Sequence, residues 1–174
     1  MFRVTNVDQE QLVTNPSLFL ENKIKQYVAN SPNNRLTAFP GERIWDEPLV
    51  GFADGDDSIF QEYKEIIGDF HLTPREALEK HHQLRGKVNY RQPNNVSVIS
   101  WILPSTHQTR LSLRSETTVP SLRWNHTRWQ GQDFIFELSR HLVSLLEGLG
   151  HLAFAPELLE YFKMVNLSNG LASN

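Results

Sequence analysis

Cysteine is absent from the 174 residues of this chain. Without a thiolate, the chain cannot form a disulfide, ligate zinc through sulfur, use a cysteine nucleophile or hold a cysteine-ligated iron–sulfur cluster. Histidine and carboxylate side chains are then the usual protein ligands that remain for a metal ion. This one absence excludes more chemistry than any other feature of the composition.

The chain also lacks a strong charge of one sign and long hydrophobic runs. Lys and Arg total 17 against 20 for Asp and Glu, so the net charge is -3 and indicates no nucleic acid or anionic membrane as a partner. No apolar run approaches the ~20 residues that span a bilayer, and residues 1–10 contain no apolar segment typical of a signal peptide. We therefore expect a cytoplasmic protein.

The spacing of apolar residues predicts helices with recognisable starts. Asn15 and Pro16 are typical of a cap and first turn, and so are Thr73 and Pro74 with Glu76 after them. The expected helices cover 16–30, 58–67, 74–84, most of 119–150, and a short stretch at 156–164.

Three apolar stretches predict strands between these helices. We expect a buried strand at 48–53, a central strand at 96–103 and a short strand at 151–155. The fold class is then α+β or α/β, with helices packed on a small mixed sheet in a single domain, 1–174. Within it we expect an N-terminal helix and loop (1–43), an α/β core (44–165) and a flexible tail (166–174).

An acidic turn, Asp54, Asp56 and Asp57, follows the first expected strand. Ligands of α/β proteins usually bind where a strand ends and a helix begins, so these acids are candidate ligand contacts. With Ser58 and Glu65 the spacing partly matches a calcium loop, but Ile59 stands where that loop needs glycine. The alternative interpretation is a strand-to-helix turn with acids near a helix N-terminus.

The densest cationic and aromatic region lies between His107 and Trp129. Arginine binds carboxylate or phosphate bidentately and tryptophan stacks on planar rings, which favours an anionic cofactor or a nucleotide-like ligand. The alternative is ion pairing with Glu116 or Asp133 and packing of the tryptophans. The candidate binding residues here are Arg110, Arg114, Trp124, Arg128 and Trp129.

No catalytic set and no metal site emerges from the remaining residues. His81 and His82 are neighbours on an expected helix and point about 100° apart, which is poor geometry for one metal ion, so we interpret them as solvated helix residues. His71 precedes a capped helix, and no partner for it can be named from the sequence.

Four segments occur in an order and spacing typical of one family. They are residues 48–57 (PLVGFADGDD), 70–76 (FHLTPRE), 99–104 (ISWILP) and 127–131 (TRWQG). With these segments the chain, from about Ile44 to its last residue, resembles the epoxyqueuosine reductase-like proteins.

The resemblance implies an N-terminal α/β region. In that family such a region precedes a segment rich in Ser, Glu, Arg and Gly, and then a ferredoxin-like cysteine cluster. Members that act in queuosine synthesis reduce an epoxide with cobalamin and two iron–sulfur clusters. Because this chain has no cysteine, we expect a relative of an oxidoreductase that holds no iron–sulfur cluster and is not active alone. It would contribute a cofactor or substrate-binding surface, with cobalamin as the cofactor that the resemblance implies.

Several origins and functions stay open at this point. The chain can be a piece cut at a domain boundary, the product of a truncated gene, or a stand-alone module, and residues 172–174 resemble the threshold of the Ser-rich segment. The expected partners are a separate C-terminal cluster domain or a second copy of the chain. An alternative function is a protein-interaction or assembly module, such as a homo-oligomer, without ligand chemistry. A metal-dependent hydrolase using His and Asp residues is a third hypothesis, and it predicts bound metal.

Overall fold

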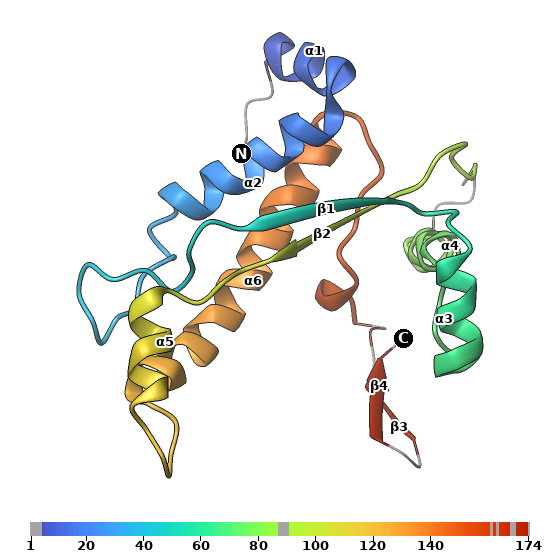
Figure 1. Cartoon of the computed structure of the whole chain (residues 1–174). Coiled ribbons are helices and arrows are strands. Elements are labelled where there is room, and N and C mark those ends of the chain that lie inside the picture. The colour runs from blue at the N-terminus through green and yellow to red at the C-terminus, as the bar shows by residue number, and fades with distance from the viewer. Residues whose placement is uncertain (1–4, 87–90, 161, 163, 168–169, 174) are drawn as a thin grey trace. The chain divides into compact units, whose positions relative to one another are not determined.

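The computed structural model describes residues 5–86, 91–160, 162, 164–167 and 170–173. The chain belongs to the α+β class, as the sequence predicts. It divides into two compact units, of which unit 1 comprises Met1–Val50 with Trp101–Ala153 and unit 2 comprises Gly51–Ser100 with Phe154–Asn174. Figure 1 shows the elements of both units along the chain. Among the described residues, no helix is long and apolar enough to cross a membrane.

Unit 1 is helical. Its helices are α1 (Asn6–Thr14), α2 (Pro16–Asn30), α5 (His107–Arg114) and α6 (Leu122–Gly148). The apolar face of α2 packs against α6, where the Tyr27 and Phe134 rings lie 6.0 Å apart between centroids. The buried side chains of this core include Phe19, Ile24, Val28, Leu36, Ile44, Phe134, Leu138, Leu142 and Leu145.

The Asn34 side chain forms hydrogen bonds that connect the end of α2 with the segment that leads into strand β1 (Leu49–Asp54). Its side chain is fully buried, and its Oδ1 accepts a hydrogen bond of 2.9 Å from the Trp45 backbone N–H. Its Nδ2 donates to the carbonyl oxygens of Val28 at 2.9 Å and of Trp45 at 3.0 Å. One amide side chain therefore satisfies three buried or partly buried backbone groups, one near the end of α2 and two at Trp45.

The loop before β1 lies along the first half of α6. Arg123 donates two hydrogen bonds to the Glu42 carboxylate, at 2.9 and 2.6 Å, and its guanidinium lies 4.3 Å from the centroid of the Phe39 ring. Further along, a Cβ on Gly131 would overlap the Trp45 ring, so the close approach of loop and helix requires glycine there. Residues 31–43 form this loop, as the turn-forming residues predict.

Unit 2 is built from short elements. It contains most of β1 and of β2 (Ser97–Ile102), which are paired with each other, helices α3 (Ile59–Ile67) and α4 (Pro74–Leu84), and the single-turn 3₁₀ helix η1 (Pro156–Leu158). Strands β3 (Met164–Leu167) and β4 (Gly170–Ser173) form an antiparallel pair in which Met164 is opposite Ser173. The boundaries between the two units fall inside β1 and β2.

The sequence prediction of a buried strand at 48–53 is wrong about burial. The strand β1 exists at Leu49–Asp54, but five of its six residues are exposed. Strand β2 is not a central strand either, because among the described residues β1 is its one partner in the sheet. The physical reason is the same for both: an apolar strand is buried only where further strands or helices cover it.

The C-terminal predictions fail as well. Residues 151–155 form no strand, and the helix expected at 156–164 is reduced to η1. The tail expected to be flexible from 166 on contains parts of β3 and β4.

Two helices, α1 and α5, were not predicted. Helix α1 begins with a capping box in which Thr5 and Asp8 bond to each other's backbone, and it buries no residue. Helix α5 buries Thr109 and has no apolar stripe. Neither helix shows the apolar periodicity from which helices are predicted.

Replacing Asn34 tests the role of its three hydrogen bonds. The Asn34→Ala variant leaves buried backbone groups without partners, and we expect the free energy of unfolding to fall by about 3 kcal/mol. All four tryptophans belong to unit 1, so urea unfolding followed by tryptophan fluorescence reports on this unit. The control is Asn33→Ala, which removes an exposed bond to Glu137 and should cost less than about 1 kcal/mol. Equal losses in the two variants would contradict this role.

Candidate functional site

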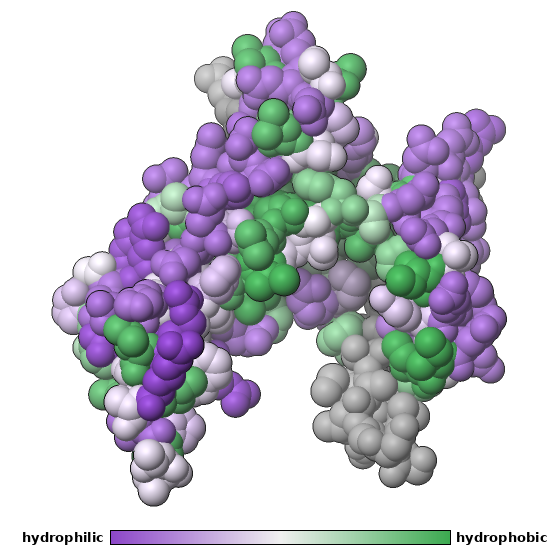
Figure 2. All heavy atoms as spheres, viewed as in Figure 1, coloured by the Kyte–Doolittle hydropathy of each residue, from purple (hydrophilic) through white to green (hydrophobic). Residues whose placement is uncertain are grey.

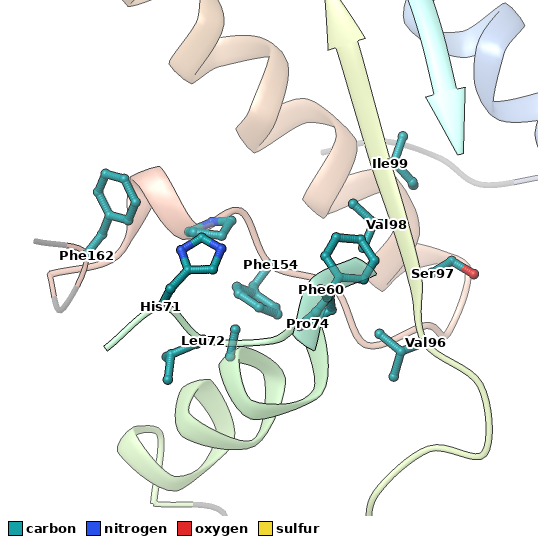
Figure 3. Close-up of a pocket in the computed structure, with 12 residues that line it drawn as sticks. Phe60, His71, Leu72, Pro74, Val96, Ser97, Val98, Ile99, Phe154 and Phe162 are labelled. Atoms are coloured by element: carbon teal, nitrogen blue, oxygen red, sulfur yellow. The ribbon is translucent and has the colours of Figure 1, made fainter. Parts of the chain in front are cut away.

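Unit 2 contains an apolar cavity of about 370 Å³. It lies among the start of α3, the turn before α4 and the start of α4, strand β2 with the residue before it, and the chain around η1 (Figure 3). The lining residues are Phe60, His71, Leu72, Pro74, Ala77, Val96, Ser97, Val98, Ile99, Phe154, Pro156 and Phe162. All of them belong to unit 2.

Two local signals place α4 and the preceding turn against the cavity. Gly68 ends α3 with a positive φ of 137°, a conformation that favours glycine, and its carbonyl oxygen accepts a bond of 2.9 Å from the His71 N–H. Thr73 caps α4 in a capping box with Glu76. The turn brings His71 and Leu72 to the cavity, and the capped helix start brings Pro74 there.

The side chains that face the cavity are almost all apolar. Figure 3 shows Val96 and Val98 directed toward the ring of Phe60, whereas the Ser97 hydroxyl points away from it. His71 contributes an imidazole to the lining. None of the described residues in the lining is a carboxylate, a lysine or an arginine.

A buried histidine fixes one wall of the cavity. The ring of His81 on α4 stacks on Phe154, with 4.9 Å between centroids and an angle of 14° between the planes. The sequence interpretation of His81 and His82 as solvated helix residues is wrong, because both are buried. They are buried inside unit 2 because the face of α4 that carries them packs against the second chain segment of this unit, which begins at Phe154.

The acidic turn is engaged in local structure. Arg75 donates two hydrogen bonds to the Asp56 carboxylate, one of them at 2.6 Å, and donates at 2.9 Å to each of the carbonyl oxygens of Pro93 and Asn94. The Asp54 carboxylate accepts from the Asp56 N–H, and that of Asp57 accepts from the Ile59 N–H. These contacts match the strand-to-helix turn that the sequence allowed. A ligand role for the three acids stays a prediction.

The acids do not assemble into a recognisable metal site. Within the described part of the chain, no three carboxylate or imidazole side chains come together as a metal-binding group. After β1 the turn continues through Asp57 and Ser58 directly into α3. A calcium loop would need further oxygen ligands at the positions that α3 occupies.

The arginine and tryptophan residues of 107–129 are distributed over different helix faces. Thr109 and Ser112 face α6, where their hydroxyls lie 3.4 Å from Thr127 Oγ1 and 2.9 Å from Ser121 Oγ. Arg110 and Arg114 are four residues apart on α5, so they share another face, and both are exposed. Arg110 donates to the Ser105 carbonyl oxygen and lies 3.9 Å from the Asp46 carboxylate.

The two tryptophans of α6 also point in different directions. Trp129 is 78% exposed, because it is two residues, or about 200°, from the buried Thr127. Trp124 is half-buried on the side of the helix that carries Gly131, while Arg128 is exposed. The five candidates thus do not converge on one point. The expected ion pairing occurs in this region, but with Glu42 and Asp46 rather than with Glu116 or Asp133.

Comparison with family models, with curated proteins and with solved structures finds no match to this chain. The resemblance to the epoxyqueuosine reductase-like proteins therefore stays a prediction. Sequence reasoning missed the cavity because its walls come from segments about 100 residues apart in the chain. The signal in the sequence that could have indicated the cavity is the set of aromatic residues at positions 60, 154 and 162.

The ion pair of Arg75 with Asp56 predicts a pH dependence. The Arg75 guanidinium holds the pKa of the Asp56 carboxyl below its ordinary value of 3.8. Because the folded-state pKa is lowered, the stabilisation is present above about pH 4 and is lost as the pH falls through the folded pKa. In Arg75→Gln, we expect the pKa of Asp56, measured by carboxyl NMR titration, to rise toward 3.8.

Asp8 provides the control in the same titration. Its pKa is lowered to about 2, chiefly by the hydrogen bond from Lys23, and should be unchanged in Arg75→Gln. An Asp56 midpoint that does not move in the variant would refute the pairing.

Proposed function

We propose that this chain is a ligand-binding region of an epoxyqueuosine reductase-like protein and has no electron-transfer centre of its own. The observation that supports the proposal is the apolar cavity of unit 2. Four of its lining residues come from two of the segments that carry the resemblance: His71, Leu72 and Pro74 from 70–76, and Ile99 from 99–104. The segments that prompted the family prediction thus also help to build the cavity.

The lining defines the class of ligand. About 370 Å³ is at the lower end of the range for small-molecule sites, so the bound group is compact. A charged group would lose its hydration without gaining an opposite charge from the described lining residues, which include no carboxylate, lysine or arginine. The rings of Phe60, Phe154 and Phe162 offer apolar contact area, and planar groups pack well against such rings. We expect an uncharged, largely apolar, planar group.

The same lining supports binding rather than catalysis. Among the lining residues that the structure describes, His71 is the one titratable side chain, and the Ser97 hydroxyl points away from Phe60 and Val98. General acid–base and nucleophilic catalysis need a nucleophile or a proton carrier with a positioned partner facing the substrate. The cavity supplies shape and apolar contacts instead.

Cobalamin, the cofactor that the resemblance implies, does not fit this cavity as a whole. A corrin macrocycle with its amide side chains is larger than about 370 Å³, and the lining offers few polar groups for amides. The proposal therefore rests on a compact ligand, and no chemical step is derived through a corrinoid. Cobalamin binding is an independent prediction, tested by absorbance and calorimetric titration; no spectral change and no heat would contradict it.

A cavity-filling variant tests the proposal, with indole as the probe. In wild-type protein with ¹³C-labelled methyl groups, indole should shift the methyl signals of Leu72, Ala77 and Val98, which line the cavity. In Ala77→Leu the added carbons occupy that space, and we expect the affinity to fall at least tenfold.

The matched control is Ala53→Leu, the same substitution at an exposed residue of β1 outside the cavity lining. It should bind indole as the wild-type protein does. Indole shifts that survive in Ala77→Leu, or that appear on methyls outside the cavity, would overturn the proposal.

A further inference from the structure

Helix α3 presents an apolar stripe that no described element of unit 2 covers. Ile59 is 40% exposed, Tyr63 41% and Ile66 79%, and no residue of the helix is buried. Steps of four and three residues place these side chains on one face of the helix. On the face visible in Figure 2, hydrophobic residues of α3 lie beside strongly hydrophilic ones. The whole helix belongs to unit 2, so one unit defines the stripe.

A different side of α3 holds the helix in unit 2. The Lys64 Nζ lies 2.6 Å from the Glu76 carboxylate of α4, and Phe60 lines the cavity. The Lys64 and Phe60 side chains are about 100–140° around the helix axis from Ile59. Phe60 also supports the stripe, because the Tyr63 ring meets it edge to face, with 6.3 Å between centroids and 83° between planes. The inward contacts thus fix α3 and leave the stripe open within unit 2.

Acids border the stripe on the side away from Lys64. Glu62 and Glu65 are exposed, and Glu62 is about 40° from Ile66 around the helix axis. Neither glutamate forms an ion pair within the residues that the structure describes. Their negative charge is therefore available to a partner that lies along the stripe.

Charge decides which partner fits the stripe. In an antiparallel pair of α3 helices from two copies, the acidic border of one helix would face that of the other, and such like charges repel each other. In a parallel pair, the acidic border would face the side of α3 that already packs on α4. An anionic membrane surface would repel the glutamates as well. A helix with Lys or Arg beside an apolar face matches both the stripe and the two glutamates.

We propose that α3 docks an amphipathic helix of a partner protein whose apolar face is bordered by Lys or Arg. Ile59, Tyr63 and Ile66 would pack against the apolar face, since steps of three and four residues form the ridges that a second helix accommodates. Glu62 and Glu65 would pair with the basic border, which gives direction and specificity. This inference is independent of the ligand of the cavity, because none of these five residues lines it.

A basic amphipathic peptide tests the proposal. The probe is Leu-Lys-Lys-Leu-Leu-Lys-Leu-Leu-Lys-Lys-Leu-Leu-Lys-Leu, titrated into the full chain with ¹⁵N and ¹³C-methyl labels. We expect it to shift the methyl signals of Ile59 and Ile66 and the amide signals of α3. The same peptide with Glu in place of every Lys should bind at least tenfold more weakly. A scrambled Leu–Lys peptide without the helical period should also bind at least tenfold more weakly.

Variants of the chain give a second, independent readout. Ile66→Ser removes apolar area from the stripe, and Glu65→Lys reverses a bordering charge; each should weaken binding of the Lys peptide at least fivefold. The matched controls are Leu122→Ser, which changes a side chain of unit 1 that is 62% exposed, and Glu116→Lys, which changes an exposed acid of the same unit. Both controls should bind the peptide as the wild-type protein does.

Four results would overturn the proposal. One is no binding of the Lys peptide, or binding that leaves the α3 signals unchanged. Another is equal affinity for the Lys and Glu peptides, or for the variants and their controls. A third is a doubled mass of the free chain by light scattering that Ile66→Ser returns to a single mass, which would show that a second copy covers the stripe. The last is Ile59 and Ile66 methyl signals that a soluble nitroxide does not broaden in the free chain, which would show that the stripe is already covered.

Discussion

The pairing of β1 with β2 is the constraint on which both units depend. Each strand begins in one unit and ends in the other, so unit 1 and unit 2 are each made of two chain segments brought together at this pair. In unit 1 the entry to β1 is fixed by Asn34. In unit 2, Val96 before β2 and Val98 within β2 line the cavity. Each unit thus contains one part of both strands.

Elements with local signals could be predicted from the sequence, and elements set by tertiary contacts could not. Thr73 with Pro74 and Glu76 begins α4, and Asn15 with Pro16 begins α2, because capping needs only neighbouring residues. Helix α5 was not predicted because hydroxyl groups such as that of Thr109 make its contacts with α6, and these leave no apolar periodicity in the sequence. The burial of β1 was predicted from its apolar composition. Composition indicates the environment that the strand favours, but it does not indicate which elements cover the strand.

The candidate site illustrates the same limit. The arginines and tryptophans of 107–129 are dense in the sequence, but helical phase directs Trp129 and Arg110 to different faces once α5 and α6 are known. The cavity needs Phe60 and Phe154 side by side across about 100 residues of chain, which no local pattern encodes. Helix starts, the acidic turn and the resemblance segments could be read from the sequence, whereas the convergence of the lining could not.

The central claim is that unit 2 keeps an apolar cavity open to a compact ligand. Xenon binds apolar cavities without chemical specificity, so methyl NMR under xenon pressure tests the claim without knowledge of the natural ligand. The account predicts xenon-dependent shifts of the Leu72, Ala77 and Val98 methyls, and their loss in Ala77→Leu. Methyl signals at these positions that do not respond to xenon in the wild-type protein would contradict it.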